Sequence, residues 1–317
     1  MRVRVPAYAK LNLGLRVLFK RPDGYHELRT VFQTISLADR LEIEFTRART
    51  TRITMEGTPD IPDNLVERAC HLALEAMKIH AHVRFNLKKN IPMGAGLGGG
   101  SSDAAAVLLA LPVLAGKPLD APGLAARLGS DIPFFLHGGT ALGLGRGEEL
   151  YPLPDRPATR ALLVLPNVHS STAEAYRDLS PALTSIALQN KLDTFQQEVW
   201  RGGAVCENDF EQVVFARHPE LKRIKQRLIR FGAKPAAMTG SGSAIFGIFA
   251  DAEELNRARQ SFAGTKFADT NEETTVFPIS FISRAQYRSA WRRALNVHAP
   301  GNLWPPQSPC APNPYVR

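Results

Sequence analysis

The chain has 317 residues, 44% of them hydrophobic and 22% charged, a balance typical of a globular protein with two moderate domains. Five of the nine excess positive charges lie among residues 284–317, so the rest of the chain is only mildly basic, which fits a polyanionic small molecule. No zinc-finger or ribonucleoprotein motif is present, and we expect no nucleic-acid partner. No apolar run of about 18 residues is present, which argues against a membrane span, and the N-terminus lacks the apolar core of an export signal. The cysteines form no paired motif, which argues against a zinc site or a disulfide framework. We therefore expect a cytoplasmic protein.

The first half of the chain reads as strands followed by alternating helices and strands. Apolar periodicity predicts strands at Arg2–Val5, Leu11–Val17, Leu28–Ser36 and Leu41–Phe45, with a turn at Arg21–Gly24. A helix is predicted from Asn64 to about Ile79 and a strand at His82–Leu87. Further helices are predicted from the serines at 101 and 102 and over Leu119–Leu128, with strand and turn over Gly138–Leu150.

A second set of elements follows a Pro-rich break at residues 152–157, which predicts a domain boundary there. The predicted strands are Arg160–Leu165, Ala236–Met238, Ser243–Phe249 and Thr275–Ile282. The predicted helices are Glu207–Ala216, Pro219–Phe231 and Glu253–Phe262. From residue 284 the chain is basic and Pro-rich; Arg284–Val297 is compatible with one helix, and we expect the rest of this tail to be irregular or disordered.

The densest motif is the glycine-rich segment Pro92-Met-Gly-Ala-Gly-Leu-Gly-Gly-Gly-Ser-Ser-Asp103, between a predicted strand and a predicted helix. Glycines visit positive φ freely, so successive N–H groups can converge on phosphate oxygens. A helix that begins at the serines adds unpaired N–H groups and the positive end of its dipole. The hydroxyls of Ser101 and Ser102 are suited to donate hydrogen bonds or to reach a metal ion. The segment therefore predicts a phosphate-binding loop.

Three other interpretations of this loop are weaker. A P-loop of the GxxxxGK[ST] type needs a lysine after the glycines, and none follows here. Gly94, Gly96 and Gly99 match the GxGxxG dinucleotide spacing, but the preceding strand is not the first of the chain and no acidic residue ends a strand about 20 positions later. A turn without any ligand is disfavoured because each glycine costs about 0.5–1 kcal/mol in ordered structure.

The segment from Pro92 to Ala106 resembles the ATP loop of the GHMP kinases. Two further regions resemble the branch of that superfamily that acts on 4-diphosphocytidyl-2-C-methyl-D-erythritol in the non-mevalonate isoprenoid pathway. They are Ala9-Lys-Leu-Asn-Leu13 with Arg21-Pro-Asp-Gly-Tyr-His-Glu-Leu28, and Ser130-Asp-Ile-Pro-Phe-Phe-Leu136 with Gly138-Gly-Thr-Ala and Gly145-Arg-Gly147. The resemblance covers roughly residues 5–283, in order and at the right spacing.

The resemblance implies a two-domain α+β fold, with a ribosomal-protein-S5-like N-terminal domain, a ferredoxin-like C-terminal domain and an active site in the cleft between them. We accordingly expect domains at residues 1–155 and 156–283, followed by the tail at 284–317. The implied reaction is direct, in-line transfer from ATP, with Mg²⁺, to the 2-hydroxyl of the cytidyl diphosphate sugar alcohol. The expected assembly is a monomer or a weak homodimer.

The resemblance also assigns residues to roles in the reaction. Asp131 matches the catalytic aspartate that accepts or orients the hydroxyl proton, although a Ser-Asp-Ile-Pro turn alone would favour a structural role. Lys10, in an apolar strand, needs a partner, and pairing with Asp131 would place positive charge beside the transferring phosphoryl group. Asn12 projects from the same face of that strand and can bond the substrate hydroxyls or the pair.

Other matching residues are implied to bind the two substrates. Tyr25 and His26 would hold the cytosine, with Tyr176 as the second aromatic ring. On the nucleotide side the implied residues are Asn64, Lys89, Pro92, Gly94, Gly96, Leu97, Gly98, Gly99, Gly100, Ser101, Ser102 and Asp103. A smaller turn at Gly240, Ser241 and Gly242 is implied to close over the phosphates, and a simple hairpin turn explains it almost as well. No residue is assigned to the metal, for which Ser101 and Ser102 are the candidates.

Two rival functions remain open from the sequence. Another GHMP kinase, acting on mevalonate or homoserine, would leave Tyr25, His26 and Tyr176 without a base to bind. A basic RNA-binding protein that has lost catalysis is disfavoured because Lys10 and Asp131 are both present.

Overall fold

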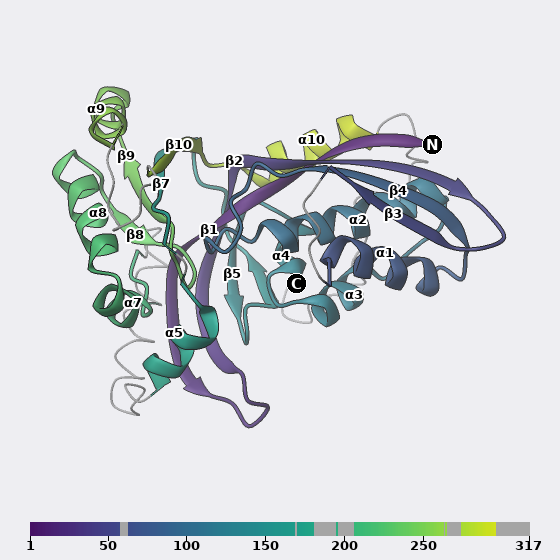
Figure 1. The fold of residues 1–317 in the computed structure, drawn as a ribbon, viewed down its shortest axis with the longest axis horizontal. Coiled ribbons are helices and arrows are strands. Elements are labelled where there is room, and N and C mark those ends of the chain that lie inside the picture. The colour runs from purple at the N-terminus through teal and green to yellow at the C-terminus, as the bar shows by residue number, and fades with distance from the viewer. Residues whose placement is uncertain are drawn as a thin grey trace, which may run out of the picture.

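The computed structural model describes residues 1–57, 63–168, 170–180, 195, 206–262, 264 and 274–295. Two α+β domains lie side by side and share one long hairpin (Figure 1). The two-domain α+β organisation expected from the sequence is therefore confirmed. Within these described residues, no helix is long and apolar enough to cross a membrane.

The N-terminal domain is built on a six-stranded sheet in the order β3-β4-β2-β5-β6, with β1 paired to β2. Its strands are β1 (Arg2–Lys20), β2 (His26–Arg47), β3 (Arg52–Glu56), β4 (Ala81–Lys88), β5 (Thr140–Leu144) and β6 (Glu149–Pro152). Its helices are α1 (Leu65–Ala76), α2 (Gly99–Ala115), α3 (Ala121–Leu128) and α4 (Ile132–Phe135). The buried faces of these helices meet the alternating apolar residues of β1, β2 and β4, as the strand periodicity predicted.

The four short strands expected in the first 47 residues are two long ones. β1 and β2 pair antiparallel along their whole length, with register shifts at Tyr8/Lys10, Asn12/Gly14 and Val17/Phe19. These irregularities explain why four short strands were predicted, because each bulge interrupts the alternation of apolar and polar positions. β3 was not anticipated from the sequence.

The C-terminal domain has a four-stranded antiparallel sheet in the order β10-β7-β9-β8. Its strands are β7 (Arg160–Leu165), β8 (Ala236–Met238), β9 (Ile245–Phe249) and β10 (Thr275–Ser280). Its helices are α5 (Thr172–Leu179), α7 (Glu211–Arg217), α8 (Pro219–Arg230) and α9 (Ala252–Phe262), and they bury their apolar stripes on one face of the sheet. Of these, α5 was expected only as a binding segment.

The other face of this sheet packs against the hairpin of the N-terminal domain. Leu163 and Phe246 of the C-terminal sheet share an apolar cluster with Leu11 of β1 and Ile35 of β2. Ala95 and Leu97 of the glycine loop belong to the same cluster. The glycine loop is therefore held at the junction of the two domains.

The first residues of the expected basic tail form α10 (Arg284–Leu295), and residues 296–317 lie outside the described part of the chain. Tyr287, Trp291 and Leu295 of α10 are buried in the core of the N-terminal domain. The helix itself was anticipated, but its place inside that core was not.

Candidate active site

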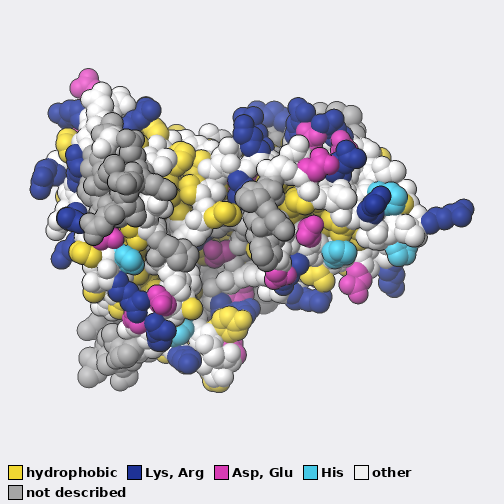
Figure 2. Space-filling view, viewed as in Figure 1, with side chains coloured by type: hydrophobic (Ala, Val, Ile, Leu, Met, Phe, Trp, Pro, Cys, Tyr) yellow, Lys and Arg dark blue, Asp and Glu magenta, His cyan; other side chains and the backbone are white. Residues whose placement is uncertain are grey.

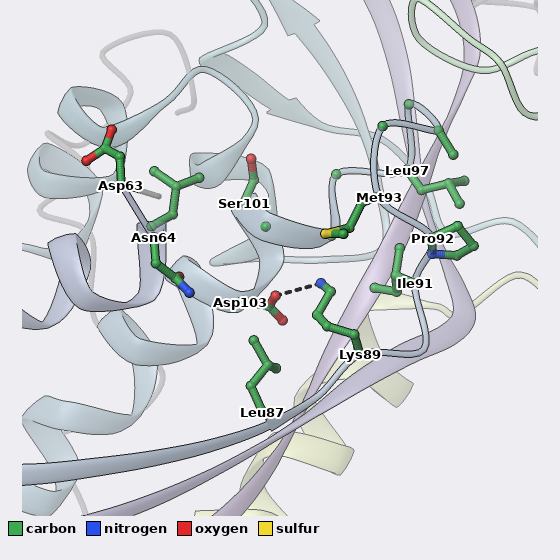
Figure 3. Close-up of a pocket in the computed structure, with 17 residues that line it drawn as sticks. Asp63, Asn64, Leu87, Lys89, Ile91, Pro92, Met93, Leu97, Ser101 and Asp103 are labelled. Carbon is green, nitrogen blue, oxygen red and sulfur yellow. Dashed lines mark hydrogen bonds and ion pairs between the residues drawn. The ribbon is translucent and has the colours of Figure 1, made fainter. Parts of the chain in front are cut away.

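The glycine loop and the start of α2 form one wall of a pocket of about 360 Å³ (Figure 3). Gly94, Gly96 and Gly98 have φ of +69°, +77° and +69°, the left-handed region that glycine tolerates. Asn64, Pro92, Ser101, Asp103 and Lys89 also line this pocket, together with Gly99 and Gly100. Apolar side chains of Leu65, Leu87, Ile91 and Met93 contribute to the walls as a flat heterocycle requires.

Two of these glycines are fixed by close neighbours as well as by their φ angles. A Cβ atom on Gly96 would lie 2.3 Å from the carbonyl oxygen of Thr239, and one on Gly98 would lie 2.8 Å from Cζ of Phe135. The loop is thus wedged between the turn after β8 and the helix α4. Leu97 is buried, and its carbonyl accepts the backbone N–H of Lys10 at 3.0 Å.

The two serines that follow the glycines point to different surroundings. Ser101 lines the pocket beside the glycine loop. Ser102 is buried, and its hydroxyl donates to the carbonyl of Tyr8 at 2.7 Å. The hydroxyl proton of Ser102 is therefore used to join α2 to β1, contrary to the expectation that both hydroxyls face the phosphates. A residue on the inner side of the first helical turn faces the sheet, which explains the difference.

Lys89 lies between two buried carboxylates at the floor of this pocket. Its Nζ contacts Oδ2 of Asp39. It also lies 2.8 Å from Oδ2 of Asp103 (Figure 3). Asp39 also accepts the backbone N–H groups of Asn90 and Ile91. Burial raises the pKa of Asp103 to about 7, although Lys89 opposes that rise. Lys89 is thus a partner of two carboxylates, a role that sequence reasoning did not foresee.

Asp103 and Asn64 each combine a structural bond with a place in the pocket. Asn64 caps α1 by accepting the N–H of Val66 at 2.9 Å. Oδ1 of Asp103 is buried and has no hydrogen-bond partner among the described residues. A buried acceptor of this kind fits a ligand hydroxyl or amino group, so the residues present suit a nucleotide.

The predicted pairing of Lys10 with Asp131 is confirmed. Nζ of Lys10 lies 3.3 Å from Oδ2 of Asp131 and donates to Oδ1 of Asn12 at 2.6 Å. Lys10 is only 3% exposed, whereas the Asp131 side chain is 32% exposed and can meet a substrate. The buried charge of the lysine is therefore compensated, as burial requires.

Asn12 is held by three elements at once. Its Nδ2 donates to Oγ1 of Thr30 at 2.8 Å, and its backbone N–H donates to Oγ1 of Thr239 at 3.0 Å. The side chain of Asn12 is consequently oriented with its oxygen toward Lys10. Thr30 and Thr239 were missed in the sequence, which carries no local signal for contacts between residues so far apart.

The second glycine turn packs directly on the first. Gly240, with φ of +60°, would place a Cβ atom 3.2 Å from the Cα of Gly96. Asn208 donates through Nδ2 to the carbonyls of Met238 and Gly240 at 2.8 and 2.7 Å, which fixes the turn. The Ser241 hydroxyl contacts that of Thr172 at 2.7 Å. The turn is thus both a link between β8 and β9 and a part of the site.

A second, larger cavity of about 620 Å³ opens beside Asp131, where the surface is hollowed between the domains (Figure 2). Gly240 and Ser241 line this cavity, whereas Gly242 lines neither of the two pockets. Gly96 and Gly98 line both pockets, so the two meet at the glycine loop. Lys10, Asn12 and Asp131 line the second cavity at that meeting point.

Aromatic side chains line the far part of this cavity. The rings of His26 and Tyr176 are stacked with centroids 4.7 Å apart, and Phe210 packs edge-on against Tyr176. Tyr25 is 57% exposed, with the guanidinium of Arg146 at 4.7 Å from its ring centroid. Burial, and then Lys20, lower the pKa of His26, while burial and the charge of Asp131 raise the pKa of Tyr176. Arg146, Thr172 and Phe210 were not singled out from the sequence, although Arg146 lies within a motif that was.

Lysine and arginine are spread over both domains on the face shown in Figure 2, with acidic side chains among them. Among the described residues, no group of three or more His, Cys, Asp or Glu side chains could hold a metal ion.

Comparisons with known proteins agree with this geometry. The GHMP kinases N terminal domain family matches residues 64–139, and the GHMP kinases C terminal family matches residues 182–268. A 4-diphosphocytidyl-2-C-methyl-D-erythritol kinase of Solibacter usitatus is 54% identical over 311 residues, which cover 95% of this chain and 96% of that protein. The same-named kinase of Moorella thermoacetica is 43% identical, covering 86% of this chain and 97% of that protein.

Solved structures give the same result. A crystal structure of a 4-(cytidine 5'-diphospho)-2C-methyl-D-erythritol kinase superposes with a TM-score of 0.72 at 37% identity, covering 88% of this chain and 98% of the other. A homoserine kinase from Cytophaga hutchinsonii shares the fold alone, with a TM-score of 0.66 at 17% identity over 89% of this chain and 95% of the other. Because it shares more than half of its residues with the Solibacter usitatus kinase and its fold with the solved 4-(cytidine 5'-diphospho)-2C-methyl-D-erythritol kinase, the chain belongs to the 4-diphosphocytidyl-2-C-methyl-D-erythritol kinase family of the GHMP kinases.

Proposed function

We propose that this chain transfers the γ-phosphoryl group of ATP to the 2-hydroxyl of 4-diphosphocytidyl-2-C-methyl-D-erythritol, in the cytoplasm. The observation that carries the proposal is the place of the Lys10–Asp131 pair, where a phosphate-binding loop meets a cavity lined by aromatic rings. Phosphoryl transfer needs positioning and charge stabilisation more than covalent chemistry, and this junction offers both.

Each residue at the junction has a defined task in this reaction. The Asp131 carboxylate accepts the proton of the attacking hydroxyl as the new O–P bond forms and the bond to the leaving ADP oxygen breaks. Lys10 offsets the negative charge that develops on the transferring group. Asn12 keeps the lysine in place. Mg²⁺ bound with ATP would supply positive charge to its phosphates, and Ser101, which lines this pocket, is the serine that would reach it.

An assay of ADP release tests the function directly. The cytidyl compound, mevalonate and homoserine are compared as phosphoryl acceptors at equal ATP. We expect turnover with the cytidyl compound alone. Turnover of mevalonate or homoserine without turnover of the cytidyl compound would reject this assignment in favour of another GHMP kinase. Strongly salt-dependent RNA binding with no ATP turnover would reject both.

Recognition of the cytosine ring can be tested at Tyr25. Because this side chain is 57% exposed, its removal should leave the fold unchanged. We expect Tyr25→Ala to raise the KM for the cytidyl substrate about 10- to 100-fold, the usual worth of a stacked base. The KM for ATP should stay near its normal value. Phe19, an aromatic residue that is 44% exposed, serves as the control when it is replaced by Ala.

The tautomer of His26 follows from its contact with Ser180. The Ser180 hydroxyl lies 2.8 Å from the carbonyl of Tyr176, which can only accept, so the serine proton is used there. At 3.2 Å from the same hydroxyl, Nε2 of His26 must therefore be the donor. Its Nδ1 is then an acceptor, which suits the 4-amino group of cytosine better than the 4-carbonyl of uracil.

Ser180→Ala should weaken this base selection. We expect the ratio of kcat/KM for cytidyl over uridyl substrate to fall about 2- to 10-fold, the net worth of one hydrogen bond. ¹⁵N chemical shifts of His26 should report a protonated Nε2 in the unaltered protein and a mixture of tautomers in the variant. Ser180→Thr keeps the hydroxyl and should restore both results. An unchanged ratio in the alanine variant would mean that the tautomer does not select the base.

A further inference from the structure

We propose that Tyr287, on the C-terminal helix α10, is a positioning residue for phosphoryl transfer that holds the short helix α4 in place. This proposal rests on the proposed role of Asp131, which directly precedes α4. No residue of α10 lines either pocket of the site, so any effect of Tyr287 must pass through other residues.

α4 cannot fix its own position. It has four residues, Ile132–Phe135, and Asp131 at its N-terminus makes no capping bond. A helix of one turn is unstable by itself, because nucleation fixes several dihedral angles for a single hydrogen bond. The place of Asp131 relative to Lys10 therefore depends on what packs around α4.

Tyr287 binds the C-terminal end of this helix. Its hydroxyl donates to the carbonyl of Phe135, and its ring lies against the turn that follows, where a Cβ atom on Gly138 would be 2.4 Å from Cγ of Tyr287. The ring of Tyr8, two residues before Lys10 in β1, lies 5.6 Å from that of Tyr287. Burial raises the pKa of Tyr287, so the phenol stays protonated and remains a donor.

Phe135 carries this restraint to the reacting groups. A Cβ atom on Gly98 would lie 2.8 Å from Cζ of Phe135 and 3.2 Å from Cε of Lys10, so the ring and the lysine both lie close to the loop at Gly98. One side of Phe135 is thus bound to α10 and the other supports the glycine loop. Release of its carbonyl would loosen both Asp131 and this support.

Hydrogen bonds also hold the first residue of α10 in place. The guanidinium of Arg284 donates to the carbonyl of Thr140 at 2.6 Å, and its backbone N–H donates to the carboxylate of Asp155 at 2.9 Å. These bonds fix the start of α10 to β5 and to the chain beyond β6. Tyr287 therefore contacts α4 from a helix that is itself fixed in place, as a positioning group requires.

The test compares Tyr287→Phe with Leu295→Ala in the full chain. Tyr287→Phe removes one hydroxyl and keeps the ring; Leu295→Ala removes buried apolar surface at the other end of the same helix. We expect Tyr287→Phe to lower kcat about tenfold, because small displacements of reacting groups are costly, with the KM values for both substrates within about twofold. Leu295→Ala should lower the urea midpoint and leave kcat of the folded protein within about twofold. Unchanged kcat in Tyr287→Phe, or an equal loss in both variants, would overturn the proposal.

A double-mutant cycle with Asp131→Asn identifies the path of the effect. If Tyr287 acts by placing Asp131, Tyr287→Phe should cost about tenfold in the normal enzyme and less than about twofold when Asp131 is already Asn. A full tenfold loss in both backgrounds would show that Tyr287 does not act through Asp131. Normal kcat in Asp131→Asn alone would instead reject the proposed role of Asp131, while the acceptor comparison in the ADP-release assay tests the function itself, so these failures are distinguished.

Discussion

Replacing Asp131 with Asn is expected to lower kcat by about 10²-fold or more, because the amide cannot accept the proton of the attacking hydroxyl. The substitution keeps the size of the side chain and the packing of α4 beneath it. The KM values for ATP and for the cytidyl substrate should change little, because the shape of the side chain is kept. Steady-state kinetics with both substrates, and ATP binding by calorimetry, measure the two effects separately.

A matched control is available at Asp120, which caps α3 by accepting the N–H of Gly123. Asn is an equally good cap, so Asp120→Asn makes the same chemical change with no effect expected on kcat or stability. Near-normal kcat in Asp131→Asn would mean that Asp131 only supports the turn before Pro133, which was the structural alternative left by the sequence.

Replacing Gly96 with Ala is expected to abolish measurable ATP binding. The new Cβ would lie 2.3 Å from the carbonyl oxygen of Thr239, an atom of backbone that cannot move aside as a side chain could. Its φ of +77° adds strain of about 1–2 kcal/mol for any residue with a Cβ atom. The loop must therefore leave its position, and the contact between the two glycine turns opens.

Gly116→Ala separates these two causes. Gly116 ends α2 with φ of +62°, and a Cβ atom there would meet nothing within 4 Å. This control bears the strain without the collision, so we expect a modest loss of stability and normal ATP binding. Should Gly96→Ala bind ATP as Gly116→Ala does, the packing of the loop against Thr239 would have no part in nucleotide binding.

The local features of the site were predictable from the sequence, and its long-range contacts were not. Lys10 was expected to need a buried partner because it interrupts an apolar strand, and Asp131 is that partner. Thr239 and Asn208 carry no such signal, since a threonine or asparagine in a loop is ordinary until its backbone partners are known. Lys89 was expected on the nucleotide side and lines the pocket at the glycine loop, but the sequence does not show that Asp39 and Asp103 converge on it.

The same distinction holds for the fold. Helices with a clear apolar stripe, such as α8, and the short apolar strand β7 were predicted nearly to the residue. The length of β1 and β2 was missed because bulges disturb the alternation on which strand prediction depends. The burial of α10 was missed because its Arg-rich outer face dominates the composition, while only Tyr287, Trp291 and Leu295 point inward.

The shared hairpin of β1 and β2 also sets how this protein can fold. Leu11 and Ile35 belong to a cluster that is completed by residues from the second half of the chain, among them Leu163, Phe246 and Ile279. Neither half therefore encloses a complete hydrophobic core, and the last strand must be in place before the first is fully covered. Many of the decisive contacts join residues far apart in sequence, a topology that favours slow folding in one cooperative transition over stepwise folding of independent halves.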